Sequence, residues 1–535
     1  MKLRTSFRVI TIFSVTVLLL GTIGFISIQA RKANLKNSIS SRPITVQPAA
    51  SRQTIKKAHA FGQKEAEETS SFNLYKYSFG FEPMFFVPTI TATKTASLAT
   101  DVNGNGFVNP GDTLMYSVVV SNSGTDAMNV VFSDQLNANL TQSGSATASP
   151  IATNDAYTSI GNVGITVPAG SGLLINDINP QGTGTISIMA VPAGTTTQGG
   201  SYALAADGSF SYNPPVGFEG ADSFVYTLTH TNGKMDTGTV NLTVSGMIWF
   251  INNNAAACTT IAGGCGRLSS PFSTLAAFSA VNIGGGSNPA TNDNIFIYES
   301  GTQYTGAVTL LTGQKLIGQD ATATLATITG ISVPTFSNAL PAMNSGNGTI
   351  TNIGSTVTLN TNTTLRGFSI NSGSSTGVND PAGAITGVSV SEVNVTTTTG
   401  TGVLLSSTGG TLSFIKVASN GAANGISLTS TTGSFAVTGT GSAGTGGTIQ
   451  NSTGNGVTLS TAASVSLSWM NIQNSGDDGI NGSTVTGFSF SDGSVINNGN
   501  STSDEGFDFT DLFGTCSITN ATVTGNAHNN FKLLN

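Results

Sequence analysis

One short segment matches the oxygen-ligand spacing of a calcium-binding loop. Positions one, three, five, seven and twelve of that loop are Asp101, Asn103, Asn105, Phe107 and Asp112, and Gly106 stands at position six. Ca²⁺ takes six or more oxygen ligands, and a glycine at position six allows the sharp turn. We expect no helices beside this segment, and its last acid is Asp rather than Glu. A polar turn without a metal ion therefore stays open beside the calcium site.

The three cysteines have different expected roles. Cys258 and Cys265 flank a glycine-containing loop, and in an exported chain we expect a disulfide bond between them. Cys516 falls on an inward position of a repeated strand, so we expect it to be an unpaired thiol in the core. This placement disfavours a metal site made of all three cysteines.

Paired carboxylates raise the question of catalysis. Asp477 and Asp478 precede Gly479 and resemble the paired aspartates of polygalacturonase-like enzymes, but the histidine and Arg/Lys motifs of that family do not follow. His528 is a lone candidate. Glycosidases need two placed carboxylates, and eliminating lyases need a base together with cations. From residue 247 onward the basic residues are few and scattered: Arg267, Lys315, Arg366, Lys416 and Lys532.

The acidic residues near the end of the chain have a simpler explanation. Asp478 occupies the position before a repeated glycine that Asn424, Asn455 and Glu505 also occupy, which marks a turn. If Asp478 and Glu505 lie on adjacent turns, their backbones are about 4.8 Å apart. A tolerated acidic surface and a weak cation site between turns both stay open. We expect no catalytic residues.

A repeat of roughly 23 to 31 residues positions these side chains. Its apolar residues recur as Val388, Val390, Val393 and Val395; as Leu412, Phe414 and Val417; as Val465, Leu467, Met470 and Ile472; as Phe488, Phe490 and Val495; and as Cys516, Ile518, Ala521 and Val523. A glycine before an apolar residue keeps the same period, at Gly402, Gly425, Gly456, Gly479 and Gly506. Alternation of period two indicates strands, and a fixed repeat indicates stacking on neighbours. The pattern predicts a right-handed parallel β-helix.

The composition favours an all-β, exported protein. Charged residues make up 8% of the 535 residues, against about 25% in ordinary globular domains, and there are 66 glycines. The net charge of −7 leaves no basic stripe, so we expect no nucleic-acid partner. Lys2, Arg4 and Arg8 precede an apolar run at residues 9–28. Residues 1–30 are therefore either a cleaved signal peptide or a membrane anchor through residues 9–28.

Two β-sandwich modules are expected after a linker at residues 31–88. Residues 89–148 contain Gly111 to Tyr116, Asn122 to Gly124 and Phe132 to Asp134, and they resemble the conserved-repeat domain of bacterial surface proteins. Residues 149–245 resemble the bacterial cadherin-like, Ig-like tandem repeat. That resemblance rests on Asn154 to Tyr157, Gly172 to Asp177, Ala206 to Pro214 and Gly220 to Tyr226. It implies a sandwich used as a spacer or adhesive module, without catalytic residues.

Residues 247–535 are expected to form one solenoid. Trp249-Phe250, Pro271 to Leu275, Asn294 to Tyr298 and Gly313 to Gly318 resemble the opening of parallel β-helix domains of surface-exposed bacterial proteins. The amphipathic piece from Thr274 to Val281 is expected to cap the first rung. Because Phe531 still follows the repeat, we expect the solenoid to be incomplete at its C-terminal end or to self-associate through its last rung.

These observations predict an exported cell-surface protein, extracellular or anchored, that is not an enzyme. We expect the β-helix, carried on β-sandwich spacers, to contact surface glycans or matrix and cell-wall components. Two alternatives stay open: a β-helix carbohydrate-active enzyme, either a polysaccharide lyase or a glycoside hydrolase, and a passive spacer without a ligand. The expected cofactor is Ca²⁺ at the loop from Asp101 to Asp112.

Overall fold

The computed structural model describes residues 2–5, 66–72, 88–123, 130–143, 145–346, 351–381 and 383–535. The chain forms two compact units, one of residues 1–148 with 180–182 and one of residues 149–179 with 183–535. The expected export segment at residues 9–28 lies outside the described residues. In the described ranges, no helix is long and apolar enough to span a membrane.

The first unit is built from antiparallel strands. A three-stranded sheet has the order β2 (Ala66–Phe72), β3 (Ile90–Thr100) and β4 (Thr113–Asn122), and β1 (Lys2–Thr5) pairs with β5 (Val130–Ser133). Strands β3 and β4 form a long hairpin, in which Ile90 pairs with Asn122. The segment from Asp101 to Asp112 is the loop of this hairpin, so strands rather than helices flank it.

The second unit begins with a two-layer β-sandwich. One sheet has the order β7 (Ile165–Val167), β11 (Phe210–Asn213), β10 (Ser201–Leu204) and β9 (Val191–Thr195). The other has the order β8 (Ile186–Ile188), β12 (Gly220–His230), β13 (Met235–Ile251) and β6 (Asp155–Gly161). Two 3₁₀ turns, η1 (Ala169–Ser171) and η2 (Leu173–Ile175), follow β7. Alternating residues of β12, among them Phe224, Tyr226 and Leu228, pack between the layers.

Strand β13 joins the sandwich to the solenoid. Residues 235–244 pair with β12, and residues 248–251 of the same strand pair in parallel with β14 (Asn294–Ile297). The border expected near residue 246 therefore falls inside one strand. The segment after α2 (Leu325–Thr329) also returns to the sandwich, where Phe336 O accepts a hydrogen bond from Thr166 N and Asn338 N donates to Gly164 O. The two modules are thus connected by a continuous strand and by this backbone pairing.

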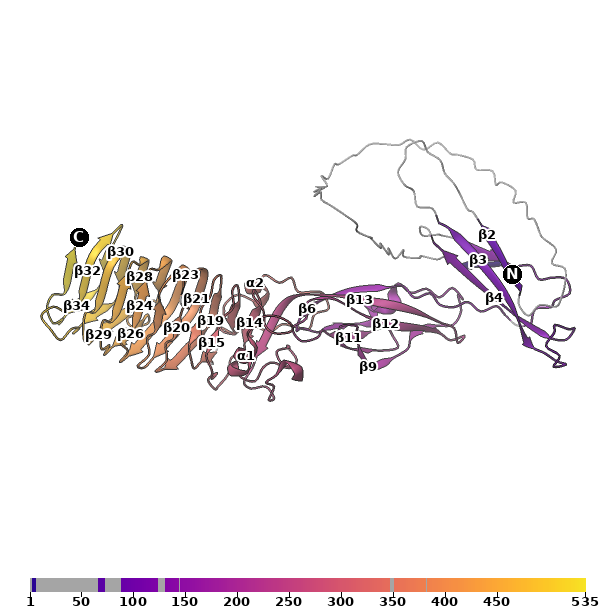
Figure 1. Cartoon of the computed structure of the whole chain (residues 1–535), viewed down its shortest axis with the longest axis horizontal. Coiled ribbons are helices and arrows are strands. Elements are labelled where there is room, and N and C mark those ends of the chain that lie inside the picture. Colours follow the sequence, from indigo (N-terminus) through magenta and orange to yellow (C-terminus); the bar gives the residue numbers. More distant parts are fainter. Residues whose placement is uncertain are drawn as a thin grey trace, which may run out of the picture. The chain divides into compact units, whose positions relative to one another are not determined.

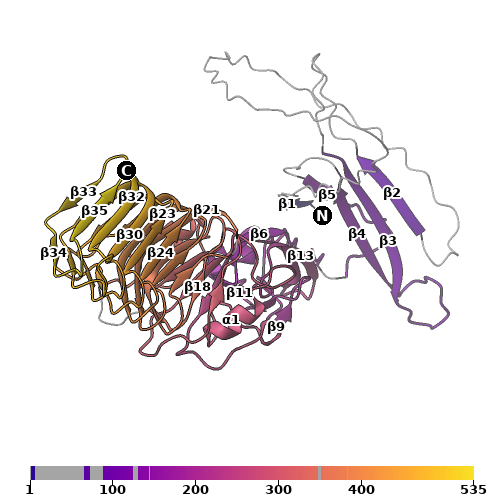
Figure 2. The same cartoon turned by 60° about the vertical axis from the view of Figure 1, so that its left-hand side comes forward.

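The solenoid consists of three ladders of parallel strands. Figures 1 and 2 show its rungs stacked in chain order, from magenta through orange to yellow. The first ladder runs from β13 through β14, β16 (Lys315–Gly318), β19 (Thr364–Gly373), β21 (Ile385–Thr397), β23 (Thr408–Asn420), β25 (Thr432–Val437), β28 (Ala463–Ser468), β30 (Ile480–Ser491) and β33 (Ser517–Thr519). The second contains β15 (Val308–Thr309), β18 (Val357–Thr358), β20 (Val378–Asn379), β22 (Val403–Leu405), β24 (Ile426–Thr429), β27 (Val457–Ser460), the start of β30, β32 (Phe507–Phe513) and β35 (Phe531–Leu534). The third contains β17 (Asn352–Ile353), the later parts of β19, β21 and β23, then β26 (Gly447–Gln450), β29 (Met470–Gln473), β31 (Ser494–Ile496) and β34 (Thr522–Thr524).

The repeat places the expected residues in the core. Every predicted inward residue from Val388 to Val495 is at most 2% exposed, and the apolar residues after the repeated glycines are fully buried. Asn451, Asn474 and Asn497 have φ values of 55°, 56° and 54° at one corner of successive rungs. Asn adopts this left-handed conformation more readily than most residues, so it keeps the corners aligned. The parallel β-solenoid expected from the repeat is confirmed.

The two ends of the solenoid differ in how they are covered. Thr274 caps helix α1 (Leu275–Val281), whose Leu275 and Phe278 pack on the first rung, as expected for a terminal cap. At the other end Ile518 is 38% exposed and Cys516 is half-buried. The expectation of a buried Cys516 thiol was therefore wrong, because no described rung packs over that position.

Candidate functional site

The hairpin loop from Asp101 to Asp112 folds around its own acidic side chains. Asp101 accepts hydrogen bonds from Gly104 N at 2.8 Å and Gly106 N at 2.6 Å, and Asp112 accepts them from Val102 N and Asn109 N. The backbone N–H groups, that of Gly106 first, lower the pKa of Asp101. Most of the loop is exposed, whereas Asp101, Asn109 and Asp112 are half-buried. The backbone N–H groups thus hold both carboxylates toward the inside of the loop.

The side chains of Asn103 and Asn105 and the backbone carbonyl of Phe107 complete the expected calcium set. Asn103 Oδ1 accepts from Asn105 N, and Asn105 Oδ1 accepts from Phe107 N at 2.8 Å. These bonds are turns that Asn and Asp make without any ligand. The calcium site stays a prediction, and the polar turn stays its alternative.

A disulfide bond joins Cys258 and Cys265 beside the first rung, with a Cα to Cα distance of 5.5 Å. Thr260 caps the short 3₁₀ turn η3 (Ile261–Gly263) inside the closed loop by accepting a bond from Gly263 N. Cys265 is buried, whereas Cys258 packs against the core from a half-buried position. The bond fastens the irregular segment before the solenoid onto its core and has no place in a metal site.

The last rungs bring acidic and basic side chains together along the start of β30, β32 and β35. Asn481, Asp508 and Lys532 are register partners on these three strands. Asp478 and Glu505 precede the same strands, and one oxygen from each of Asp478, Glu505 and Asp508 lies within 4.8 Å of the others. We call these three carboxylates the acidic cluster. The stacking of Asp478 on Glu505 was expected from the repeat, but the basic side chains were not.

Asp478 is buried rather than part of an acidic surface. Its side chain is 3% exposed, and its Oδ1 accepts a hydrogen bond from Glu505 N at 2.6 Å. Its Oδ2 accepts one from Asn481 Nδ2 at 2.7 Å, and its own N–H donates to Asn455 Oδ1. Burial raises the pKa of Asp478 to about 6, and the two donors offset this only in part. The expectation that Asp478 lies on an acidic surface is wrong, because adjacent rungs cover its side chain.

Glu505 and Asp508 are balanced by the next rung. Glu505 is 1% exposed, and its Oε1 lies 2.9 Å from His528 Nδ1. Lys532 Nζ donates to Asp508 Oδ2 at 2.8 Å and lies 3.7 Å from Glu505 Oε2. The hydrogen bond to Asp508 raises the pKa of Lys532. His528 was expected to be a lone candidate, and Lys532 one of a few scattered basic residues. Both instead contact the acidic cluster.

The acidic cluster has limited access for chemistry. A glycosidase places two carboxylates on opposite sides of an accessible bond, about 5 to 9.5 Å apart. Here Asp478 and Glu505 are almost fully covered. Both oxygens of Asp478 and Oε1 of Glu505 pair with Glu505 N, Asn481 and His528, whereas Glu505 Oε2 has no hydrogen-bond partner among the described residues. The three carboxylate oxygens could share a cation, but the Lys532 ammonium already lies against two of them.

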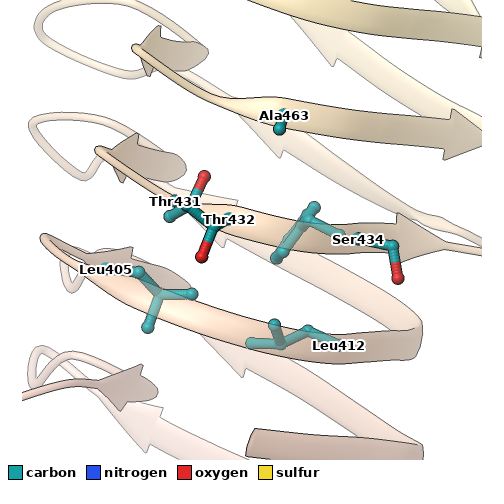
Figure 3. A pocket seen from close by; sticks show the side chains of 7 residues that line it. Leu405, Leu412, Thr431, Thr432, Ser434 and Ala463 are labelled. Atoms are coloured by element: carbon teal, nitrogen blue, oxygen red, sulfur yellow. The ribbon is translucent and has the colours of Figure 1, made fainter. Parts of the chain in front are cut away.

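Two hollows, one in the solenoid and one at its junction with the sandwich, do not add a site for chemistry. Figure 3 shows one between successive rungs, lined by Leu405, Leu412, Thr431, Thr432, Ser434, Phe435 and Ala463. It has no space even for a water-sized sphere, so it is a packing feature of the corner. A groove of about 230 Å³ lies where the segment Pro334 to Phe336 meets β6. Neither hollow gathers titratable side chains.

A second group of buried carboxylates lies in the sandwich. Asp155 begins β6, and Asp177 follows η2. Burial, followed by the charge of Asp177, raises the pKa of Asp155 to about 7. Burial is also the main cause that raises the pKa of Asp177 to about 6, although Thr153 N and the Tyr226 hydroxyl lie 2.8 Å from its Oδ1. Both residues stand in segments quoted above for a family resemblance, and no role was expected for them.

Comparison with known proteins supports the modular reading. Residues 147–246 match the family model of the bacterial cadherin-like domain. No curated protein matches the chain. Among solved structures, a family 28 exopolygalacturonase of Yersinia enterocolitica is similar over 61% of this chain and 85% of that one, with 9% identity and a TM-score of 0.18. That likeness is too low to carry any argument about activity. The chain thus contains a bacterial cadherin-like domain joined to a parallel β-solenoid.

Proposed function

We propose that the chain is an exported surface protein whose solenoid binds hydroxyl-rich polymers, such as surface glycans or cell-wall components, without catalysis. The observation that carries this proposal is the set of uncharged polar ladders on the outer faces of the rungs. Gln473 Nε2 donates to Gln450 Oε1 at 3.0 Å, and Asn451 Nδ2 donates to Asn420 Oδ1 at 2.8 Å. Such ladders repeat amide donors and acceptors at a fixed spacing along the axis.

The outer ladders suit a polymer with repeated hydroxyl groups. On β29 and β31, Ser494 Oγ donates to Asn471 Oδ1 at 2.9 Å, and Ser491 Oγ bonds to Ser468 Oγ at 3.0 Å on neighbouring strands. These side chains are half-buried, so they are ordered and still reach solvent. The low charge of the chain avoids a strong dependence on salt. The shared strand β13 lets the sandwich carry the solenoid without a linker between them.

A binding array of glycans and matrix proteins tests this proposal. We expect the purified chain to bind a subset of glycans, and the pair of changes Asn471→Asp and Gln473→Glu to weaken that binding by adding charge to one ladder. Gln198→Glu, an exposed change on the sandwich, is the matched control and should leave binding unchanged. A blank array would favour the passive spacer. Protease shaving of intact cells checks export, and protection of the whole chain would contradict it.

A carbohydrate-active enzyme is the second candidate, and the convergence of His528 and Lys532 on the acidic cluster favours it. An acid with a pKa near 6, such as Asp478, suits general acid catalysis if a conformational change exposes it. Screening acidic and neutral polysaccharides for cleavage tests this candidate. Activity that Asp478→Asn abolishes and Asp477→Asn retains would replace the binding proposal. A lack of cleavage together with binding on the array would support the binding proposal.

A further inference from the structure

Trp469 is held in a backbone conformation that a bulky residue seldom adopts. Its φ is 60°, in the left-handed region, where the Cβ atom crowds the backbone. Every other non-glycine residue with positive φ in the described part of the chain is Asn, Asp, Glu, Ser or Thr. In the next two rungs the same corner carries Asp492, with φ 56°, and Asn520, with φ 49°. A small polar residue would therefore fit this corner better than the indole does.

An insertion at residues 438–446, between β25 and β26, packs against this tryptophan. A Cβ atom on Gly439 would lie 2.7 Å from Trp469 Cβ and 2.9 Å from its Cδ1, so only a glycine allows this close approach. Within the insertion, Thr445 Oγ1 accepts a hydrogen bond from Thr440 N at 2.9 Å. The tip of the insertion is exposed. The insertion is thus an ordered wall beside the indole that still reaches solvent.

The indole of Trp469 is half-buried and keeps its polar atom available. Its N–H donates no hydrogen bond to any residue that the structure describes. The other tryptophan, Trp249, is fully buried, and its Nε1 donates to Asp293 Oδ2 at 2.8 Å. An indole N–H that serves only core packing usually finds such a partner. Trp469 therefore retains both ring surface and a donor for a ligand.

The side chains around this corner suit a ligand with hydroxyl groups. Asn520 Nδ2 donates to Asp492 Oδ1 at 3.1 Å, and Asn471 Oδ1 accepts from Ser494 Oγ at 2.9 Å. Successive rungs are about 4.8 Å apart, so Asp492 lies one rung from Trp469. A pyranose ring has C–H groups that pack on an aromatic face and hydroxyl groups around its edge. An indole beside a carboxylate and amides matches both parts of such a ring.

The charge in this part of the chain disfavours an acidic sugar. No Lys or Arg stands between Lys416 and Lys532, and Lys532 is paired with Asp508. The same interval contains the acidic residues Asp477, Asp478, Asp492, Asp504, Glu505, Asp508 and Asp511. A sugar carboxylate beside Asp492 would meet a like charge, and like charges brought together at an interface oppose binding. The ligand that fits is therefore a neutral saccharide.

We propose that Trp469, Asp492 and the insertion at residues 438–446 bind a neutral pyranose ring of a glycan. The indole stacks on the C–H face of the ring, and the indole N–H and the Asp492 carboxylate bind its hydroxyl groups. This site rests on the proposed function, glycan binding by the solenoid, and assigns to it one corner and one class of sugar. A strained backbone is often retained where the strained residue serves binding rather than stability.

Tryptophan fluorescence of the purified chain tests the site, because the chain has two tryptophans and Trp249 is enclosed in the core. Cellohexaose and chitohexaose are neutral saccharides of glucose and of N-acetylglucosamine. Titration with at least one of them should move the emission to shorter wavelength, since the sugar displaces water from the indole of Trp469. The acidic saccharide hexagalacturonate should cause a smaller shift. No response to either neutral saccharide at millimolar concentration, or a larger response to hexagalacturonate, would overturn the proposal.

Trp469→Asn separates binding from folding, because Asn adopts the left-handed conformation more readily than Trp. It should weaken binding of the neutral saccharide by about 30-fold in calorimetry, the loss typical of a central aromatic contact, without lowering the melting temperature. Trp469→Tyr keeps an aromatic face and should weaken binding less. The fluorescence of the unchanged chain decides the question even if Trp469→Asn does not fold.

Thr461→Asn is the matched control, because Thr461 has a φ of 52° at another corner of the solenoid. It relieves the same kind of strain and should leave saccharide binding unchanged. If Trp469→Asn binds the saccharide as well as the unchanged chain does, the site is wrong and the proposed function stands. If the unchanged chain binds no glycan on the array, the proposed function and this site both fail.

Discussion

Buried carboxylates occur in both the sandwich and the solenoid, but the two regions stabilise them differently. In the solenoid, Asp508 and Glu505 face Lys532 and His528 on the next rung, and Asp478 accepts a bond from Glu505 N. A repeat fold stacks equivalent positions, so a basic residue one period later lies directly over an acidic one. The sandwich has no such succession. Its carboxylates come from segments distant in sequence, and burial raises the pKa of both Asp155 and Asp177.

The largest expected effect comes from placing a charged carboxylate in the apolar core of the solenoid. Leu467→Asp would place a charge in the middle of the solenoid core, where Leu467 is fully buried between Phe490 and Val437 on the paired strands. We expect a loss of about 4 kcal/mol in the free energy of unfolding. Denaturant unfolding followed by circular dichroism measures it.

Ser466→Asp, on the outward face of the same strand, is the control for this change. It should alter the free energy of unfolding by less than about 0.5 kcal/mol, as surface substitutions usually do. Equal losses from both variants would show that the inward register of β28 is wrong.

The second effect is a pH dependence set by Asp478. Because the folded state raises the pKa of Asp478 from 3.8 to about 6, it holds the proton more tightly than the unfolded chain does. Stability should therefore fall as the pH rises from about 4 through about 6, by on the order of 2 kcal/mol. Asp478→Asn should remove this fall and be more stable than the unchanged chain at pH 7.

Asp477 is the matched control for this measurement, because it is exposed beside Asp478. Asp477→Asn should keep most of the fall between pH 4 and pH 6, because burial is the main cause of the raised pKa of Asp478 and the charge of Asp477 is a smaller one. If Asp478→Asn keeps the full fall between pH 4 and pH 6, another group titrates in the folded solenoid and the burial of Asp478 does not control it.

A smaller effect is expected from Lys532, which is 34% exposed. Lys532→Met leaves Glu505 and Asp508 without their ammonium group and should destabilise the last rungs by about 1 to 2 kcal/mol. Asp508→Asn in the same chain should recover part of this loss, since one of the unpaired charges is gone. A double-mutant cycle on the free energy of unfolding measures the coupling. Additive losses would show that the pair does not interact.

The repeat made much of the solenoid predictable. The alternation and the repeated glycine gave the inward residues and placed Asp478 on the same turn as Glu505. The basic partners of the acidic cluster were not predicted, although the same register contained the signal for Lys532. Phe531 aligns with Phe507, so the next residues, Lys532 and Asp508, must be neighbours. Burial was also misjudged, because a turn position is exposed in an isolated rung and covered in a stack.

The pair in the sandwich could not be predicted in the same way. Asp155 and Asp177 are separated by 22 residues without a shared period, and their segments meet through the bridge between Ile151 and Ile178 and through the hydrogen bonds of Asp177 with Thr153 and Tyr226. The repeated dipeptides Asn154-Asp155 and Asn176-Asp177 were the available signal. Without the topology of the sheets, however, the sequence does not show that these two dipeptides meet in the fold, since Asn and Asp are common in ordinary turns.

The smallest expected effect concerns the hairpin loop from Asp101 to Asp112. Its carboxylates are only half-buried and already accept backbone hydrogen bonds, so they carry no unbalanced buried charge. Each oxygen keeps a second lone pair and can still bind an ion, but water competes for that ion at an exposed site. We therefore expect Ca²⁺ to bind this loop only weakly. Hydrogen exchange at residues 102–109 during a Ca²⁺ titration measures this binding.

The double change Asp101→Ala, Asp112→Ala separates binding from local folding in this loop. It removes the acceptors of Gly104 N, Gly106 N, Val102 N and Asn109 N, so exchange at these amides should be faster even without Ca²⁺. If the loop binds the ion, slowing by Ca²⁺ at residues 102–109 should also disappear. If exchange at residues 102–109 of the unchanged chain does not respond to Ca²⁺, the loop is a polar turn whose carboxylates serve only its own backbone.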